Sequence, residues 1–365
     1  MLRASRSSVL ILLRTSACRA VQLGLVLLAL GACAGGASSR LSGPQCDSVC
    51  ALTRLAASSS VPMPSDSLLP VWTATPDGSE QFTHPSVLLF PSGWHGWRYW
   101  LADTPPSAAS EDPALFVSDN GRYFVPPTGT DTPLERPDAG AYLSDPDLHL
   151  IGGDSIGLVY RETNGLDDEL WMATSPDGVS WSRPEELLSD SADADLSPSV
   201  VSQPSWGLWA VDAGRDGCSS QATTVRYRAS SDGATWEEPA VTDLAVPGYE
   251  VWHLDVAYVP SREEYWALVA AYPDGTSCAS TDLFLAASAD GLHWTTWPSP
   301  VLRRGESPLF AKSVYRSTMA VNPASDSVTI WYSGVGGAYQ GDWRLAVARF
   351  PIGDLLRRVT AAAYR

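Results

Sequence analysis

The chain has 365 residues, 44% of them hydrophobic, and carries 24 basic against 41 acidic side chains, a formal net charge of −17. This acidity argues against nucleic acid as a partner, and we expect a monomer with a large folded core. The histidines are scattered singly and no phosphate-cradling glycine loop occurs, so no zinc motif or nucleotide cofactor is indicated.

Residues 1–32 have the features of an export signal. The first thirty residues contain four arginines and no acid, and residues 21–30 form an apolar run. The run ends in Leu30-Gly31-Ala32-Cys33, which resembles the lipobox of bacterial lipoproteins and implies a lipid on Cys33. An ordinary signal peptide cleaved nearby is the alternative. We expect an exported protein that is lipid-anchored to the bacterial cell envelope at the outer membrane and touches the membrane only through this anchor.

A tether, residues 33–65, follows the signal and holds two further cysteines. After export, Cys46, Cys50, Cys218 and Cys278 remain as an even set in an oxidising compartment. We expect Cys46 to pair with Cys50 and Cys218 with Cys278. A metal at the C-x-x-x-C pair is the alternative, but no histidine or second cysteine pair lies nearby.

An internal repeat dominates residues 66–351. Gly121, Gly178, Gly233 and Gly291 lie 57, 55 and 58 residues apart, each in an Asp-Gly or Asn-Gly turn with an aromatic residue three positions later. Such turns predict β-hairpins. They resemble the Asp-box of sialidase-like propellers, which implies that their aspartates are structural and lie opposite the active site.

A second repeated run precedes each hairpin and has five copies, beginning near His84, Asp145, Ser197, Trp252 and Arg316. Each is followed by an apolar or aromatic strand. The pattern predicts an all-β fold, a five-bladed β-propeller of four-stranded antiparallel blades. We expect residues 69–74 to supply the outer strand of the last blade, and residues 352–365 to form a tail or short helix.

The five blades and the Asp-Pro start of the second inner strand resemble the arabinanase, xylosidase and invertase class of glycoside hydrolases. That resemblance implies a catalytic acid at the start of each of the first three blades. Here His84 stands where an aspartate is expected, Asp145 matches, and Ser197 stands where a glutamate is expected. Glycoside hydrolysis needs two carboxyl groups. The resemblance to five-bladed relatives that act on anhydrosugars implies that a histidine can serve as the acid in place of one of them.

The candidate site lies where the inner strands begin, at the mouth of a central funnel. The expected catalytic residues are Asp145, His253 and Asp255. The expected substrate-binding residues are His84, Glu111, Glu162, Trp252 and Arg316. Each has a plainer role as well: Asp145 could cap a turn, Arg316 could neutralise Asp145, and the two histidines could line the channel or hold a calcium or sodium ion.

The sequence thus indicates a propeller that acts on an extracellular oligosaccharide or polysaccharide as a glycoside hydrolase. A non-catalytic glycan-binding or scaffold lipoprotein is the alternative, because two of three expected carboxylates are missing. A sialidase is a third interpretation, but that class has six blades and three arginines around its substrate.

Overall fold

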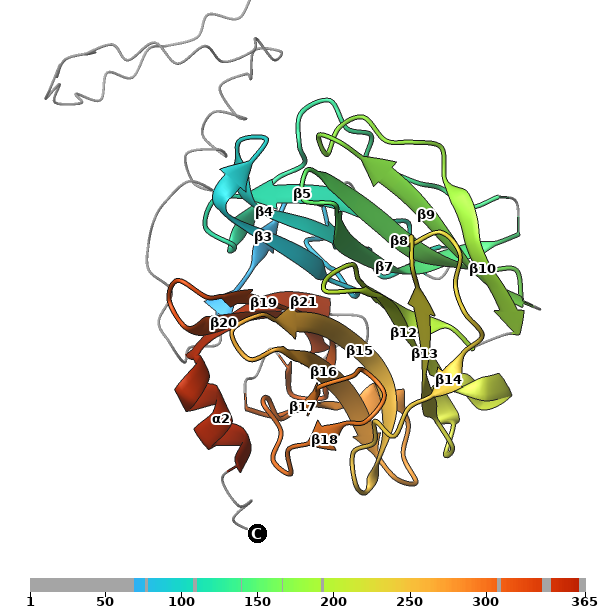
Figure 1. The fold of residues 1–365 in the computed structure, drawn as a ribbon, viewed down its shortest axis with the longest axis vertical. Coiled ribbons are helices and arrows are strands. Elements are labelled where there is room, and N and C mark those ends of the chain that lie inside the picture. Colours follow the sequence, from blue (N-terminus) through green and yellow to red (C-terminus); the bar gives the residue numbers. More distant parts are fainter. Residues whose placement is uncertain are drawn as a thin grey trace, which may run out of the picture. The chain divides into compact units, whose positions relative to one another are not determined.

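Five antiparallel sheets surround a central axis in the computed structural model (Figure 1). The structure describes residues 69–360 apart from 76–77, 108–109, 139, 166, 192–193, 307–309 and 337–342. The predicted all-β, five-bladed propeller is confirmed. Cys33, Cys46 and Cys50 lie outside the described residues. Within the described part, no helix is both long enough and apolar enough to cross a membrane.

The blades follow one another in chain order, and their strands have the following bounds. The first blade contains β3 (Ser86–Trp94), β4 (Trp97–Asp103), β5 (Ala114–Ser118) and the short β6 (Tyr123–Phe124). The second contains β7 (Tyr142–Ile151), β8 (Ser155–Thr163), β9 (Asp167–Ser175) and β10 (Glu185–Ser191). The third contains β11 (Leu196–Val201), β12 (Trp206–Asp212), β13 (Thr224–Ser230) and β14 (Ala240–Val241). The fourth contains β15 (Tyr249–Val259), β16 (Glu264–Pro273), β17 (Asp282–Ser288) and β18 (Thr295–Thr296).

The fifth blade closes the ring. It contains β19 (Ser313–Asn322), β20 (Ser327–Val335) and β21 (Trp343–Pro351), and its outer strand is β1 (Leu69–Pro70), which pairs antiparallel with β21. The next short strand, β2 (Trp72–Thr73), pairs with β6 of the first blade. The predicted closing strand is therefore confirmed for residues 69–70 alone, whereas residues 72–73 pair with the first blade, so that one N-terminal segment joins the first and last blades. Helix α2 (Ile352–Thr360) follows, with Ile352, Leu355 and Val359 buried.

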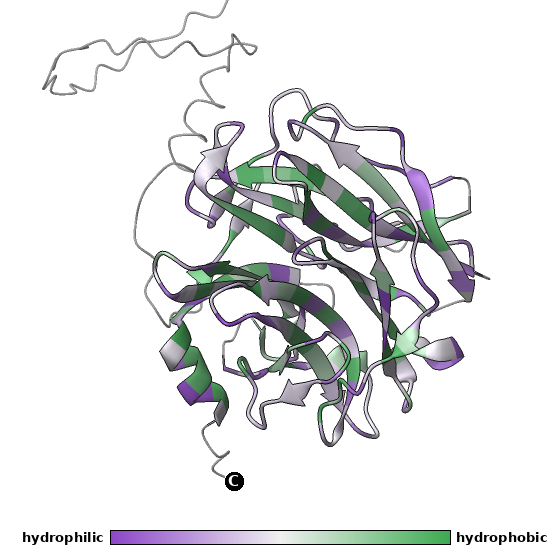
Figure 2. Cartoon of the chain, viewed as in Figure 1, coloured by the Kyte–Doolittle hydropathy of each residue, from purple (hydrophilic) through white to green (hydrophobic). Residues whose placement is uncertain are grey.

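Each interface between neighbouring blades has its own hydrophobic core, and apolar residues run along the strands in Figure 2. Tryptophans cross these interfaces to reach the predicted hairpins. The indole of Trp209 on β12 donates to the carbonyl of Gly291 in the fourth blade at 2.8 Å, and the indole of Trp331 on β20 donates to the carbonyl of Gly121 in the first blade. The hairpin glycines thus contribute to contacts between blades as well as to the turns.

A ring of five hydrogen bonds connects the inner strands around the axis. At corresponding positions, one side chain of each inner strand accepts from a backbone N–H of the next. The five acceptor and donor pairs are Ser86 with Leu148, Asp147 with Val200, Ser199 with Val256, Asp255 with Met319, and Thr318 with Val87, at 2.8 to 3.2 Å. The last pair joins the fifth blade to the first, so the ring is continuous.

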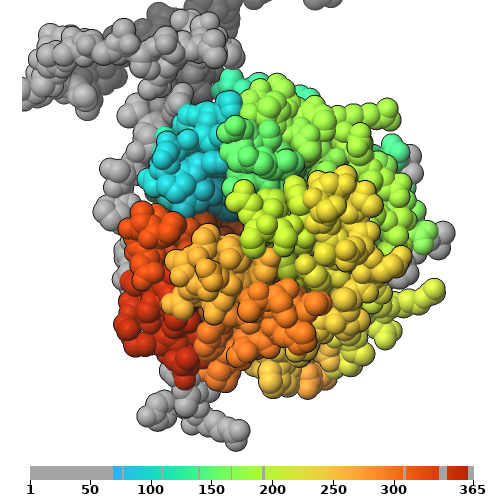
Figure 3. Space-filling model, in the orientation of Figure 1, coloured from blue at the N-terminus to red at the C-terminus, as the bar shows by residue number. Residues whose placement is uncertain are grey.

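A disulfide bond connects the third and fourth blades. The predicted bond between Cys218 and Cys278 is present and joins the short 3-10 helices Gly214–Ser219 and Cys278–Ser280. The hydroxyl of Tyr272 donates to the carbonyl of Ser220 beside it, at 2.7 Å. In the space-filling view, early, middle and late parts of the chain meet near the centre of the ring (Figure 3).

Candidate active site

The candidate site is built from the same position in all five blades. Each inner strand contributes one residue, which lies two positions before the residue whose side chain accepts in the ring of hydrogen bonds. These residues are His84, Asp145, Ser197, His253 and Arg316. The register shifts at this point in β7, β11, β15 and β19, which marks a bulge. Asp145 and Ser197 have φ angles of 54° and 53° there. A bulge re-aims a side chain out of the sheet, so these residues converge on the axis.

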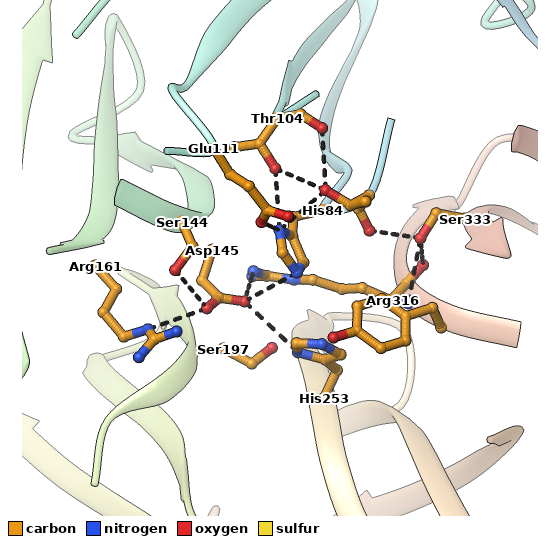
Figure 4. A network of polar contacts seen from close by, with 12 residues as sticks. His84, Thr104, Glu111, Ser144, Asp145, Arg161, Ser197, His253, Arg316 and Ser333 are labelled. Atoms are coloured by element: carbon orange, nitrogen blue, oxygen red, sulfur yellow. Dashed lines mark hydrogen bonds and ion pairs between the residues drawn. The ribbon is translucent and has the colours of Figure 1, made fainter. Parts of the chain in front are cut away.

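Asp145 lies at the centre of the cluster (Figure 4). Its Oδ1 accepts from Nη1 of Arg316 at 2.9 Å, and its Oδ2 accepts from Nε of Arg161 at 3.1 Å and from Oγ of Ser144 at 3.0 Å. Burial acts to raise the pKa of Asp145, but the charges of His84, Arg161 and Arg316 outweigh it and hold that pKa well below its usual value. The carboxyl group is therefore always ionised near neutral pH.

Two imidazoles face the same carboxylate oxygen. Nε2 of His84 and Nδ1 of His253 each lie 3.6 Å from Oδ1 of Asp145. His253 is 2% exposed, and neither of its ring nitrogens makes a hydrogen bond within the described residues. Burial, opposed by Asp145, holds the pKa of His253 well below its usual value, so this ring is neutral. A buried polar ring with no hydrogen bond needs another partner.

The geometry of these three groups fits a metal ion. Their ligand atoms all lie within 4.8 Å of one another. Ligand atoms about 2.1 Å from a tetrahedral zinc ion lie about 3.4 Å apart, close to the two observed separations. Two imidazoles and one carboxylate favour a transition metal, whereas calcium and sodium, the ions that the sequence left open as an alternative, prefer oxygen ligands. Neutral His253 is already in the protonation state that binds metal.

Neighbouring side chains orient this cluster. Nδ1 of His84 lies 2.9 Å from Oε2 of Glu111 and 3.0 Å from Oγ1 of Thr104, which leaves Nε2 to face Asp145. A histidine that binds metal usually donates its other N–H to a carboxylate in this way. Nη1 of Arg161 also donates to Oδ1 of Asp168, which is fully buried, at 3.0 Å. The sequence did not indicate Asp168, because its contact with Arg161 depends on the pairing of β8 with β9.

Tyr315 lies beside both histidines of the cluster. Its ring centroid lies 5.7 Å from that of His84 and 4.5 Å from that of His253. Its hydroxyl accepts a hydrogen bond from Nε1 of Trp252 at 3.0 Å. Burial raises the pKa of Tyr315, so the phenol keeps its proton. The adjacency to Arg316 in the sequence was visible, but the contacts with both histidines were not.

Three expected site residues lie elsewhere. Asp255 belongs to the ring of hydrogen bonds between blades, so its expected catalytic role is replaced by a structural one. Glu162 follows Arg161 on β8, so the two side chains point to opposite faces of the sheet and Glu162 faces away from Asp145. The charges near Glu162 are those of Glu169 and Asp138. Trp252 is 7% exposed and packs in the core behind Tyr315, so it offers no open face to a sugar.

The other expected residues do converge. His84, Glu111, Asp145, His253 and Arg316 form one network of contacts in Figure 4. Arg316 neutralises Asp145, the simpler of its two expected roles, and its Nη2 donates to the carbonyl of Pro198 at 3.2 Å.

Comparison with known proteins relates the chain to enzymes that act on carbohydrates. No family model matches it. An A type blood N-acetyl-alpha-D-galactosamine deacetylase from Flavonifractor plautii is 27% identical over an alignment of 313 residues, which covers 70% of this chain and 40% of the relative. The chain thus spans less than half the length of that relative.

Solved structures share its fold. An N-acetylgalactosamine deacetylase from F. plautii, in complex with blood group B trisaccharide, superposes with a TM-score of 0.71 at 24% identity, covering 80% of this chain and 97% of that one. The catalytic domain of a GH62 alpha-L-arabinofuranosidase from Coprinopsis cinerea superposes with a TM-score of 0.56 at 14% identity, covering 78% and 96%. The chain has the glycoside hydrolase-like five-bladed propeller fold found in these carbohydrate-active enzymes.

Proposed function

We propose that this protein is a metal-dependent hydrolase that removes the acetyl group from an N-acetylated sugar of a glycan. The observation that carries the proposal is the arrangement of His84 and His253, each with a nitrogen 3.6 Å from the same oxygen of Asp145. The reaction adds water across an amide C–N bond and yields acetate and an amino sugar. The likeness to the F. plautii deacetylase supports this substrate class.

Cleavage of a glycosidic bond, our expectation from the sequence, has less support. A glycosidase needs one carboxyl group that donates a proton and a second that attacks carbon or activates water. Asp145 has a strongly lowered pKa and is paired with two guanidinium groups, so it cannot donate a proton near neutral pH. The equivalent position in the third blade is Ser197. A metal site needs no such pair.

The chain's own residues have separable roles in this proposal. His84, Asp145 and His253 would hold the metal, which when bound polarises a carbonyl oxygen and lowers the pKa of water. Glu111 fixes the ring orientation of His84, and Arg161 and Arg316 fix the carboxylate of Asp145. The hydroxyl of Tyr315 accepts from Trp252, so its own proton is available for the oxygen of the substrate amide.

In this proposal the protein is exported and its active site lies outside the cell. The leader with its lipobox-like end at Cys33 supports export and lipid anchoring. The disulfide bond between Cys218 and Cys278 adds support, because such bonds persist in oxidising compartments.

The test uses the protein from Gln45 onward, loaded with zinc or manganese. We expect one metal ion per chain by mass spectrometry, and release of acetate with a free amine from an N-acetylgalactosamine-terminated oligosaccharide. His253→Ala should lose both. His95→Ala, which changes an exposed histidine in the β3–β4 hairpin, is the matched control and should keep both.

Each contrary result has a distinct meaning. Reducing sugar without acetate would identify a glycosidase, and metal binding that survives His253→Ala would rule out the proposed ligand set. Saccharide binding without either product would favour the non-catalytic glycan-binding alternative.

A further inference from the structure

The interface between the second and third blades is open on its outer side. Its apolar core has five buried residues, Val159, Leu170, Val200, Leu208 and Ala210, and is the smallest of the five described interface cores. Farther out, β10 and the β13–β14 segment enclose a groove of about 500 Å³. Asp190, Arg226, Trp236 and Val241 are among the residues that line it. This volume is in the range of small-molecule sites.

Ion pairs hold the polar wall of this groove in place. Oδ2 of Asp190 accepts from Nη1 of Arg226 at 2.6 Å and from Nη2 of Arg228 at 2.9 Å. The side chain of Arg228 is 5% exposed, and its Nη1 donates to the fully buried Asp195 at 2.8 Å. Arg226 also donates to Asp212 of the third blade at 2.6 Å. The carboxylate of Asp190 and the guanidinium groups of Arg226 and Arg228 are thus held in place before a ligand binds, which lowers the entropic cost of binding.

The other walls of the groove include the side chains of Trp236 and Val241. Trp236 is partly exposed, but its indole N–H is buried and makes no hydrogen bond within the described residues. Val241 is 65% exposed, and the neighbouring Glu237 and Glu238 are exposed acids at the edge. An aromatic ring and an apolar side chain beside fixed carboxylate and guanidinium groups match a sugar, which has apolar faces and a polar rim.

The Asp190 end of the groove lies level with the candidate active site. Asp190 on β10 pairs in register with Asp168 on β9, and Asp168 connects through Arg161 to Asp145. Three strand spacings separate β7 from β10, which places the groove about 14 Å outward from β7.

We propose that this groove is a second carbohydrate-binding site, which holds sugar rings of a glycan. The proposal concerns binding alone and does not depend on the reaction in the funnel.

The experiment follows the indole N–H signal of Trp236 by ¹H–¹⁵N NMR, assigned with Trp236→Phe. The probe is an N-acetylgalactosamine-terminated A-type blood group oligosaccharide, and acetate is measured in the same samples. We expect a saturable shift in the wild type and in His253→Ala, where the sugar would not be consumed. Val241→Trp, which fills the groove, should abolish the shift. Val179→Trp, which changes an exposed valine on another hairpin, should preserve it.

An indole signal that does not move, or that moves equally in Val241→Trp, would overturn the second site. A shift without acetate release would instead leave the second site standing and count against the deacetylase.

Discussion

Asp145 has an unusual backbone conformation, which directs its side chain toward the central axis. A φ of 54° is uncommon for a residue other than glycine, and aspartate is among those that adopt it most readily. The strain is offset by three hydrogen bonds, which the side chains of Ser144, Arg161 and Arg316 donate to the carboxylate of Asp145. Such strain is often found where a side chain is aimed into a functional site.

Hydrogen-bond direction makes Tyr315 a proton donor. The indole of Trp252 can only donate, so it occupies a lone pair of the Tyr315 hydroxyl and leaves that hydroxyl's proton for another acceptor. The raised pKa of Tyr315 keeps this proton in place at neutral pH.

We therefore predict that Tyr315→Phe lowers kcat for acetate release about 100-fold and changes KM little, as expected for a donor to a developing oxyanion. The matched control is Tyr332→Phe, because the buried hydroxyl of Tyr332 makes no hydrogen bond within the described residues. Unchanged kcat in Tyr315→Phe would remove Tyr315 from the proposed reaction.

At the scale of single elements, the glycine of a hairpin meets two requirements, a positive φ angle and enough space for a neighbouring side chain. Gly291 has a φ of +80°, and a Cβ placed there would lie 2.6 Å from the ring of Trp209. Gly305 has a φ of +84°, with no atom within 4 Å of such a Cβ. The two glycines therefore separate backbone strain from crowding.

We predict that Gly305→Ala lowers the free energy of unfolding by about 1 kcal/mol, the cost of the left-handed conformation alone. Gly291→Ala should cost about 1–3 kcal/mol more, because the methyl group also displaces Trp209. Urea denaturation of both variants measures the difference. Equal losses would show that the contact between Trp209 and Gly291 is not tightly packed.

Elements with a repeated local signal could be predicted from the sequence, and contacts between elements could not. The spaced Asp-Gly turns indicated the hairpins, the five runs near His84 to Arg316 indicated the inner strands, and the position of residues 69–74 indicated the closing strand. The convergence of His84, Asp145 and His253 followed from blade equivalence. No local pattern reveals strand register or bulges. These decide that both histidines face the same oxygen of Asp145, that Asp168 contacts Arg161, and that Asp255 lies in the ring of hydrogen bonds.

The ring of five hydrogen bonds involves the whole molecule, because it joins every inner strand to the next around the axis. Two of its acceptors, Asp147 and Asp255, are carboxyl groups. Burial, followed by the charge of Asp147, raises the pKa of Asp255 to about 7 from its ordinary value of 3.8. Asp255 is therefore protonated in the folded protein at pH values where the unfolded chain has already released this proton.

This difference fixes the sign of a pH effect on stability. Between about pH 4 and pH 7 the folded state binds the extra proton, so the contribution of Asp255 to the free energy of unfolding falls as pH rises and then levels off above pH 7. An amide at this position can accept the N–H of Met319 but cannot ionise. We predict that Asp255→Asn gains stability relative to the wild type as pH rises from 4 to 7, with a constant difference above 7.

Urea denaturation of the two proteins at several pH values measures this difference, and titrating groups that do not interact with Asp255 cancel because both proteins share them. A difference that does not depend on pH would show that Asp255 ionises normally and that the two carboxyl groups of the ring do not interact. The predicted dependence would show instead that closing the blades into a ring forces one of its own acceptors to remain protonated.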